Sequence, residues 1–142
     1  MNFPKTVFLC DDDPDDRFLI SNALMEVAPD VRIVEAEDGQ KLLDVINQQD
    51  KQTTSLFLLD MNMPRMNGLE TIVQIRSIPE LSDIPAVMFS TSSDTQLVKR
   101  ALSAGINHYI RKPDTFEGFI EMALFVKSSY LQKQSIRARC NW

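Results

Sequence analysis

Short apolar segments alternate with stretches of helical periodicity along the whole of this chain of 142 residues. Three of the apolar segments are almost unbroken runs, which is typical of strands that helices cover on both faces of a parallel sheet. The pattern therefore predicts an α/β fold in which five strands form one doubly wound parallel sheet. The strands are expected over residues 6–10, 31–36, 56–59, 86–90 and 108–111.

The segments between the strands carry apolar residues three or four positions apart, which is the spacing of one helix face. Asp13 is predicted to cap the first helix, with Pro14 at its first helical position. Asp38 and Gly39 open the second helix, and Gly105 suits the C-terminal end of the fourth. The third, fourth and fifth helices are expected around residues 68–77, 98–105 and 116–131, with polar loops over 47–55 and 78–85.

The composition is that of a single globular domain that binds no nucleic acid. The net charge is −5 and the isoelectric point is about 4.8, whereas a nucleic-acid footprint needs a basic face. Cys10 and Cys140 are too few and too far apart to form a disulfide framework. No apolar run approaches the roughly 18 residues of a membrane span, and no signal peptide is recognisable. We therefore expect a cytoplasmic domain over residues 1–131, without membrane contact, and a polar tail over 132–142.

Charged and hydroxyl side chains stand where the predicted strands end. They are Asp11 and Asp12 after the first strand, Asp60 at the end of the third, Ser90 at the end of the fourth and Lys112 after the fifth. The carboxyl ends of parallel strands meet at one edge of a sheet, and doubly wound folds bind their ligands at that edge. These side chains are therefore expected to share one small pocket.

Three carboxylates in one pocket raise one another's pKa, so the predicted site favours a bound cation. Mg²⁺ prefers oxygen ligands and usually keeps several waters, which suits this set of residues. A soft-metal site is not expected, because His108 is the only histidine and no cysteine–histidine cluster exists in the sequence. The acidic run continues to Asp15 and Asp16, which we interpret as first-turn residues that favour the helix dipole and stand apart from the site.

Four motifs at these strand ends resemble the receiver domain of two-component response regulators, over about residues 5 to 130. The motifs are the acidic pair after the first strand, "LLDMNMPRMNG" at 58–68, "MFSTSS" at 88–93 and "AGINHYIRKP" at 104–113. A single acidic pair or Lys-Pro pair would mean little, but all four stand in order at strand ends. The resemblance implies a flavodoxin-like (βα)₅ fold with the strand order 2-1-3-4-5.

The resemblance also implies a role for each acidic residue of the site. Asp60 is expected to accept a phosphoryl group from a phosphohistidine of a histidine kinase or a histidine phosphotransfer protein. Asp12, Asp60 and the backbone carbonyl of Asn62 would be ligands of Mg²⁺. Asp11 would contribute through a water molecule, one step removed from the cation.

Further roles implied by the resemblance concern the neighbouring strands. Lys112 is expected to pair with Asp60 and later with a phosphoryl oxygen, and Ser90 to donate a hydrogen bond to the phosphoryl group. Phosphorylation would draw Ser90 inward and let Tyr109 turn inward with it. Pro113 is expected to follow a cis peptide bond.

The signal would leave the domain through a face with two states, made by the fourth helix, the strand 108–111 and the last helix. A downstream protein partner is expected on this face. Met122, Phe125 and Val126 lie off the core stripe of the last helix. Either this helix has a broad buried face that includes them, or they form a second, exposed apolar edge for a partner or a weak dimer. Asn62 and Ser92 are expected to tune how long the phosphoryl group survives, and their small uncharged side chains predict an intermediate lifetime.

The leading interpretation is a phosphorylation-switched binding module, monomeric or weakly dimeric, rather than an enzyme with a substrate of its own. Eleven residues follow position 131, too few for an output domain. One alternative is a phosphohydrolase of the haloacid-dehalogenase type, which normally has a second Asp two residues after its nucleophile, where this chain has Asn62. Another is a receiver-like adaptor that works without phosphorylation, against which the complete acidic and lysine set argues.

Overall fold

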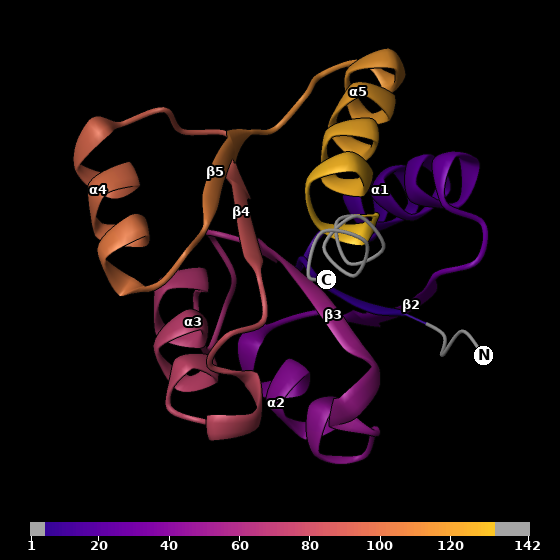
Figure 1. Cartoon of the computed structure of the whole chain (residues 1–142). Helices are drawn as coiled ribbons and strands as arrows, with labels where there is room; N and C mark the ends of the chain where they lie inside the picture. The colour runs from indigo at the N-terminus through magenta and orange to yellow at the C-terminus, as the bar shows by residue number, and fades with distance from the viewer. Residues whose placement is uncertain (1–4, 133–142) are drawn as a thin grey trace, which may run out of the picture.

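The computed structural model describes residues 5–132, and a five-stranded sheet runs through their centre (Figure 1). Neighbouring strands are parallel throughout, in the order β2-β1-β3-β4-β5. The strands are β1 (Thr6–Cys10), β2 (Arg32–Ala36), β3 (Thr54–Asp60), β4 (Ala86–Ser90) and β5 (His108–Arg111). The predicted flavodoxin-like fold and its strand order are thus confirmed.

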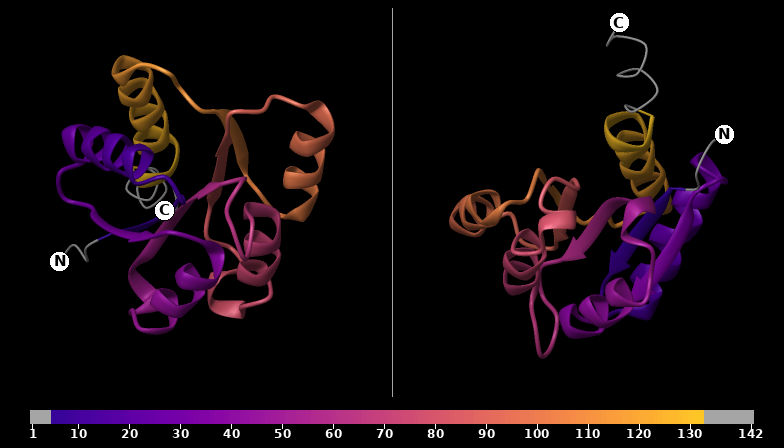
Figure 2. Two further views of the ribbon diagram at one scale, coloured as in Figure 1. Left: turned by 180° about the vertical axis from the view of Figure 1, so that it is seen from behind. Right: turned by 60° about the horizontal axis from the view of Figure 1, so that its bottom comes forward.

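The helices that connect these strands are α1 (Pro14–Val27), α2 (Gly39–Asn47), α3 (Gly68–Arg76), α4 (Thr95–Ala104) and α5 (Phe116–Val126). A π-helical turn (Lys127–Leu131) continues α5. α1 and α5 lie side by side on one face of the sheet, and α2, α3 and α4 cover the other face (Figures 1 and 2). Every connection between sequential strands therefore passes through a helix, as parallel pairing requires.

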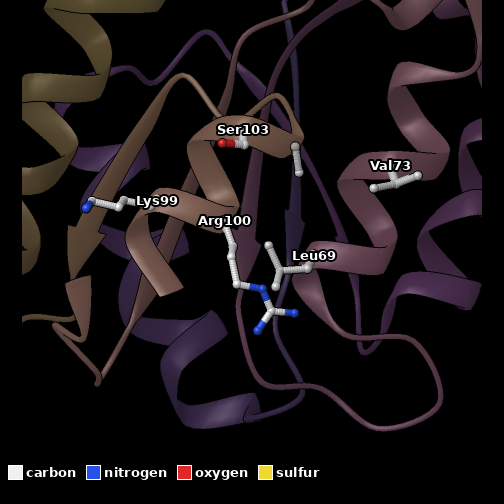
Figure 3. Close-up of a pocket in the computed structure, with 6 residues that line it drawn as sticks. Leu69, Val73, Lys99, Arg100 and Ser103 are labelled. Atoms are coloured by element: carbon white, nitrogen blue, oxygen red, sulfur yellow. The ribbon is translucent and has the colours of Figure 1, made fainter. Parts of the chain in front are cut away.

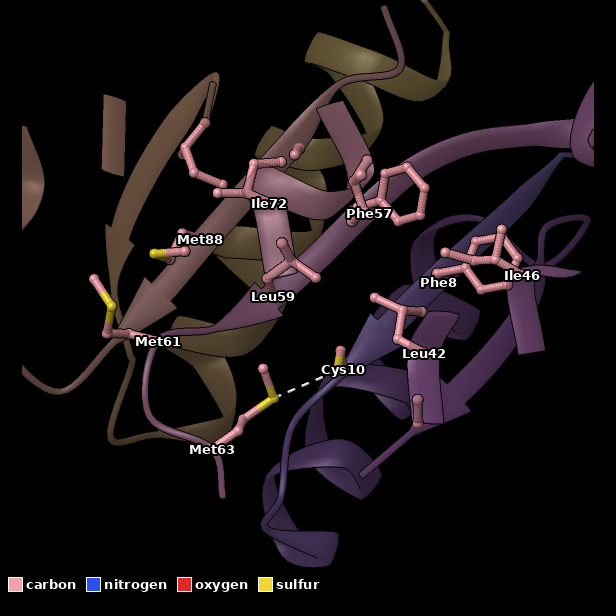
Figure 4. Close-up of a cluster of buried hydrophobic side chains, with 14 of the residues drawn as sticks. Phe8, Cys10, Leu42, Ile46, Phe57, Leu59, Met61, Met63, Ile72 and Met88 are labelled. Atoms are coloured by element: carbon pink, nitrogen blue, oxygen red, sulfur yellow. Dashed lines mark hydrogen bonds between the residues drawn. The ribbon is translucent and has the colours of Figure 1, made fainter. Parts of the chain in front are cut away.

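Side chains alternate along the central strands between two hydrophobic cores. Phe8 and Phe57 point toward α2 and α3, and their rings stack with centroids 5.6 Å apart (Figure 4). Leu9 and Leu58 point to the opposite face, among the apolar residues of α1 and α5. Because β1, β3 and β4 are packed on both faces, their carboxyl ends are held in fixed relation to one another.

Helix termini follow the capping chemistry that the sequence predicted. The Asp13 side chain accepts the Asp15 N–H at the start of α1, and Pro14 occupies the first helical position. Asp38 accepts the Lys41 N–H at the start of α2. These caps set where α1 and α2 begin, directly beyond the carboxyl ends of β1 and β2.

The predicted loop before β3 is shorter than expected. β3 begins at Thr54 rather than residue 56, because Thr54 pairs with Thr6 of β1. The shortened loop before β3 holds a 3₁₀ turn (Lys51–Thr53), and the loop before β4 holds another (Pro79–Leu81). The α-helical pattern after β4 also starts earlier than predicted, at Thr95. The starts of β3 and α4 depend on backbone pairing and on local turns, and the spacing of apolar residues does not reveal these.

Of the two interpretations of the last helix, the broad buried face is confirmed, and the exposed edge made by Met122, Phe125 and Val126 is wrong. Met122 and Val126 are buried in the core between α5 and the sheet, and Phe125 is half-buried. The exposed apolar side chains of α5 are instead Phe116 and Leu124, each about half exposed. α5 packs against both α1 and the sheet, so its buried face is wider and is rotated relative to the stripe read from the sequence.

Every helix within residues 5–132 is too short or too polar to span a bilayer. Of the tail predicted over 132–142, only Gln132 belongs to the described residues. Cys10 is buried in β1, where its thiol donates to the Met63 sulfur at 3.3 Å (Figure 4). Burial, followed by the nearby carboxylates of Asp38, Asp11 and Asp60, raises the pKa of this thiol far above its ordinary value, so Cys10 is a packing residue.

Candidate functional site

The carboxyl ends of the strands meet at one edge of the sheet, as the sequence predicts. β3 and β4 are aligned so that Asp60 lies beside Phe89, the residue before Ser90. The backbone N–H of Lys112 donates to the Ser90 carbonyl at 2.7 Å, which holds the lysine beside β4 directly after β5 ends. Sheet pairing therefore brings residues from distant parts of the chain to one place.

Asp11, Asp12 and Asp60 form a compact acidic group at this edge. Each offers one carboxylate oxygen, and these atoms lie within 4.8 Å of one another. Asp11 is fully buried, Asp60 is 4% exposed and Asp12 is exposed at the rim. Asp11 is tied down by the backbone N–H of Asp13, which donates to its Oδ1 at 2.9 Å. One carboxylate is thus fixed inside, one is fixed at the end of β3, and one faces solvent.

Lys112 contacts three carboxylates, and the predicted partner is the most distant of them. Its Nζ lies 2.8 Å from Asp16 Oδ2, 3.0 Å from Asp11 Oδ2 and 3.5 Å from Asp60 Oδ1. Its side chain is 10% exposed, and Nζ also lies 5.5 Å above the centre of the Phe89 ring. The ammonium is therefore shared within the site rather than paired with Asp60 alone.

Asp16 is the site residue that the sequence interpretation missed. It was assigned to the helix start with Asp15, yet its carboxylate accepts a hydrogen bond from Lys112 at 2.8 Å. A signal for this existed, because helical side chains lean toward the helix N-terminus, and α1 begins at the edge where β1 ends. Asp16, but not Asp15, leans back over that edge.

The electrostatics of the group follow from burial and like charge. Burial and then the charge of Asp11 raise the pKa of Asp60 to about 7, although Lys112 acts in the opposite direction. Burial likewise raises the pKa of Asp11. Burial would lower the pKa of Lys112, but its hydrogen bond to Asp16 and the charge of Asp11 outweigh this and raise the pKa above its ordinary value. The carboxylates carry more negative charge than one lysine can balance.

The acidic group fits a hard divalent cation. It consists of oxygen donors, as Mg²⁺ prefers, and Asp12 keeps one side open to solvent for the waters that Mg²⁺ retains. Asp11 Oδ2 is buried and makes no hydrogen bond within the described residues, although the Lys112 ammonium is close in distance. A bound cation would interact with this buried oxygen, and it would favour the ionised forms of Asp11 and Asp60, whose pKa values are raised.

Comparison with known proteins agrees with this geometry. The family described as the response regulator receiver domain matches residues 7–123 of the chain. The chain belongs to the response regulator receiver domain family. A chemotaxis protein CheY homolog of Campylobacter jejuni is 34% identical over 109 residues, which is 77% of this chain and 82% of that protein. The response regulator Rcp1 of Synechocystis is 27% identical over 141 residues, which is 96% of each chain.

Solved structures of the same family have the same fold. The phosphorylated cyanobacterial phytochrome response regulator RcpA superposes with a TM-score of 0.82 at 27% identity, covering 92% of this chain and 96% of that one. The Mn²⁺-bound form of response regulator Rcp1 superposes with a TM-score of 0.75 at 26% identity, covering 89% and 94%. This chain is therefore a receiver of the CheY and Rcp1 type, with an acidic cluster of Asp11, Asp12 and Asp60.

Ser90 and Tyr109 of this receiver domain are linked through the backbone of one residue, Ser92. Ser90 is fully buried, and its Oγ accepts the backbone N–H of Ser92 at 3.1 Å. The half-buried Tyr109 donates its hydroxyl hydrogen to the Ser92 carbonyl at 2.9 Å. Ser92 thus links the end of β4 to the β5 side chain through its backbone, while its own Oγ accepts the Asp94 N–H.

Two further positions with a predicted role are Asn62 and the peptide bond before Pro113. Asn62 is exposed beside Asp60, and its N–H lies 3.5 Å from Asp60 Oδ1, at the outer limit of a hydrogen bond. The expected cis bond before Pro113 is wrong, because every peptide bond within residues 5–132 is trans. For an X–Pro bond the trans isomer is already the more stable by about 0.5–1 kcal/mol. With this bond trans, the Lys112 side chain reaches the acidic group and the Lys112 N–H donates to the Ser90 carbonyl.

The loop between β3 and α3 is anchored to the start of α2 by an arginine in an unusual backbone conformation. Arg65 has φ 63°, in the left-handed region that favours glycine or asparagine. Its Nε and Nη2 both donate to the buried Asp38 Oδ2, at 2.9 and 2.6 Å. The ion pair holds in place the loop that carries Asn62 past Asp60.

Arg65→Ala is expected to lower the urea midpoint of unfolding more than Arg65→Gly does. Alanine loses the ion pair and keeps the backbone strain, whereas glycine loses the ion pair but relieves the strain. Lys41→Ala, which removes an exposed positive charge near the same Asp38, is the control and should change the midpoint little. An equal loss in both Arg65 variants would show that the backbone is not strained there.

Gly68 lets α3 approach the backbone of the phosphoacceptor candidate. A Cβ at this position would lie 2.5 Å from the Asp60 carbonyl oxygen and 3.0 Å from Met61 Cα, closer than real Cβ contacts. The Gly68 N–H meanwhile donates to the Met61 carbonyl at 2.9 Å. The close approach fixes the end of β3 against the first turn of α3.

Gly68→Ala is therefore expected to destabilise the protein by about 1–3 kcal/mol in urea unfolding. The reason is that the added Cβ meets the backbone of Asp60 and Met61, which is fixed in the sheet and cannot move away easily. Alanine ordinarily stabilises a helix relative to glycine, so the sign itself reports the clash. Gln74→Ala, on the exposed face of the same helix, is the control and should be near neutral. A stabilised Gly68→Ala variant would contradict the close approach.

A shallow groove lies between α3 and α4, away from the acidic group (Figure 3). Leu69 and Val73 line it from α3, and Lys99 and Arg100 line it from α4. None of its lining residues belongs to the site at the strand ends. The groove contributes mixed apolar and basic character to the α3–α4 side of the receiver domain.

Proposed function

We propose that this protein is a phosphorylation-switched receiver in which Asp60 accepts a phosphoryl group from a phosphohistidine of a histidine kinase or a histidine phosphotransfer protein. The observation that carries the proposal is the position of Asp60 at the end of β3. There it lies nearly buried within 4.8 Å of Asp11 and Asp12 oxygens and 3.5 Å from the Lys112 ammonium. The family membership of the chain supports the same role.

The proposed transfer is a displacement at phosphorus. A carboxylate oxygen of Asp60 forms a bond to the phosphorus, and the bond from phosphorus to the histidine nitrogen breaks. The bonding electrons return to the imidazole, which takes up a proton from solvent and leaves neutral. Asp60 then carries an acyl phosphate. Lys112 and the Ser90 hydroxyl are the donors placed to hold the phosphoryl oxygens, and most of the work is positioning and charge stabilisation.

Mg²⁺ is the cation that we propose for the acidic group, held by Asp12, Asp60 and the backbone carbonyl of Asn62, with Asp11 acting through water. When bound, it would offset the negative charge of the carboxylates and of the transferred phosphoryl oxygens. The compact oxygen set of this chain supports the proposal. So does the Mn²⁺-bound form of the relative Rcp1, a divalent ion on a similar fold.

The proposed switch runs from Ser90 to Tyr109 through Ser92. Moving the Ser90 hydroxyl toward a phosphoryl group would give up its contact with the Ser92 N–H, and the carbonyl of the same residue accepts the Tyr109 hydroxyl hydrogen. The β4–α4 loop and Tyr109 would then be free to rearrange together, which biases the α4–β5–α5 face. Leu102 on α4, and Phe116 and Leu124 on α5, are half-exposed apolar residues that a downstream protein partner could cover.

The domain is proposed to catalyse only its own phosphorylation and dephosphorylation. Asn62 and Ser92 lie beside the site and carry no ionisable group to activate or repel water, so the proposed phosphoryl lifetime is intermediate. The haloacid-dehalogenase alternative is disfavoured, since Asn62 stands where that class has its acid/base aspartate. The adaptor alternative predicts that no phosphoryl group is taken up at all.

The test is incubation with acetyl phosphate and Mg²⁺, read by intact mass. The wild-type protein should gain one phosphoryl group, whereas Asp60→Asn should gain none. A half-life of many hours for the phosphoryl group would contradict the intermediate lifetime. Continued release of phosphate from ordinary phosphate esters would favour the hydrolase. A wild-type protein that never gains mass would overturn the proposal and favour the alternative of an adaptor that works without phosphorylation.

A further inference from the structure

The ion pair between Asp16 and Lys112 connects the first turn of α1 with the end of β5. Lys112 Nζ donates a hydrogen bond to Asp16 Oδ2 at 2.8 Å, the shortest of its three carboxylate contacts. Nothing in the capping of α1 requires this contact, because Asp13 supplies the cap. The pair therefore serves the site rather than the helix.

Asp15 provides the internal comparison. It stands one residue earlier in the same first turn, carries the same charge and faces the same helix dipole. Its side chain is exposed and forms no ion pair with any residue in the range 5–132. An effect of Asp16 beyond that of Asp15 therefore reports its place in the site, in contact with Lys112.

Three carboxylates share the charge of this lysine. Its Nζ donates a hydrogen bond to Asp16 and lies 3.0 Å from Asp11 Oδ2 and 3.5 Å from Asp60 Oδ1. A phosphoryl group on Asp60 would need Lys112 for its own oxygens, so it competes with Asp11 and Asp16. Asp11 is fully buried, whereas the Asp16 side chain is 25% exposed and can be hydrated when the lysine leaves. Of the two contacts, the one to Asp16 is therefore the cheaper to release.

We propose that Asp16 is a positioning residue that holds Lys112 in the resting protein and competes with the phosphoryl group for it. Asp16 thereby keeps the ammonium at the rim, 3.5 Å from Asp60, and weakens the hold of the site on a phosphoryl group. This inference rests on the proposed function of Asp60. It assigns Asp16 a part in setting the balance between resting and phosphorylated states.

The experiment is a titration of the Mg²⁺-saturated protein with beryllofluoride, a phosphoryl mimic, followed by ¹⁹F NMR of the bound fluorides. Asp16→Asn is expected to bind beryllofluoride roughly 3–10-fold more tightly than wild type, since the competing carboxylate is gone and the repulsion falls. Asp15→Asn removes the same charge without touching Lys112 and should change the affinity by less than about twofold. Asp16→Glu, which keeps a carboxylate in reach, should restore an affinity near that of wild type.

Folding is checked by urea unfolding of each variant, and Asp16→Ser replaces Asp16→Asn if the latter does not fold. Equal affinities in Asp16→Asn and Asp15→Asn, or weaker binding in Asp16→Asn, would overturn the role of Asp16. If wild type takes up a phosphoryl group from acetyl phosphate but Asp16→Asn behaves as Asp15→Asn does, only this inference fails. If wild type neither takes up a phosphoryl group nor binds beryllofluoride, the proposed function fails with it.

Discussion

Asp12→Ala is expected to abolish Mg²⁺-dependent phosphorylation of the receiver while leaving the fold intact. Asp12 is the exposed member of the acidic group, so its removal takes away a proposed cation ligand without opening the core. The remaining carboxylates would have fewer oxygens for the cation and no acid facing solvent at the rim. We expect the rate of phosphorylation to fall by at least about a hundredfold. The rate is measured from the phosphorylated fraction, by intact mass, during incubation with acetyl phosphate and Mg²⁺.

Asp15→Ala is the matched control for this loss. Asp15 lies three residues further on, in the same acidic run, but it belongs to the first turn of α1 and faces solvent. Its removal should cost only about 0.3–1 kcal/mol of stability through the helix dipole and should leave the phosphorylation rate close to that of wild type. Comparable losses in the two variants would mean that the overall charge of the loop, and not a ligand at Asp12, controls phosphorylation.

Asp60→Asn is expected to stabilise the metal-free protein at neutral pH even though it removes the proposed phosphoacceptor. Burial and the charge of Asp11 disfavour the ionised form of Asp60 and raise its pKa to about 7. An amide of the same shape avoids that cost. The gain should be on the order of 1–3 kcal/mol, seen as a rise of roughly 4–10 °C in the midpoint of thermal unfolding in EDTA.

The same prediction has a defined dependence on pH. Below about pH 3 the Asp60 carboxyl is protonated in both the folded and the unfolded protein, so the two proteins should unfold at similar temperatures. As the pH rises toward 7, the unfolded protein releases this proton while the folded protein retains it, and wild type loses stability relative to Asp60→Asn. Above about 7 the difference should stay constant. A difference that is independent of pH, or that Asp15→Asn reproduces, would contradict the origin of the effect in Asp60.

The parts of the fold that depend on local chemistry could be predicted from the sequence. β1 and β4 are short apolar runs followed by polar residues, and both have the predicted bounds. Asp13 and Asp38 are short acceptors placed directly before helical stripes, and both cap their helices. Gly105 ends α4 with φ 116°, as its lack of a Cβ allows. Each of these features is decided by a few neighbouring residues.

Features that depend on how elements pack against one another were not predictable in the same way. Helical periodicity left open whether Met122 and Val126 are buried or exposed, and they are buried because α5 packs against α1 as well as against the sheet. The left-handed backbone of Arg65 is compensated by a residue 27 positions earlier, which no local pattern reveals. The bond before Pro113 is trans, whereas the expectation of cis came from resemblance alone.

The sequence by itself determined that Asp11, Asp12, Asp60 and Lys112 would meet, because each stands at the end of a strand and parallel strands end at one edge. Only the tertiary structure decided how the charge among them is shared. It placed Asp16 closer to the lysine than Asp60 is, and it buried Asp11 while leaving Asp12 exposed. The reason is physical: strand order follows from hydrophobic periodicity, but distances between charges depend on where a helix begins and which way its side chains lean.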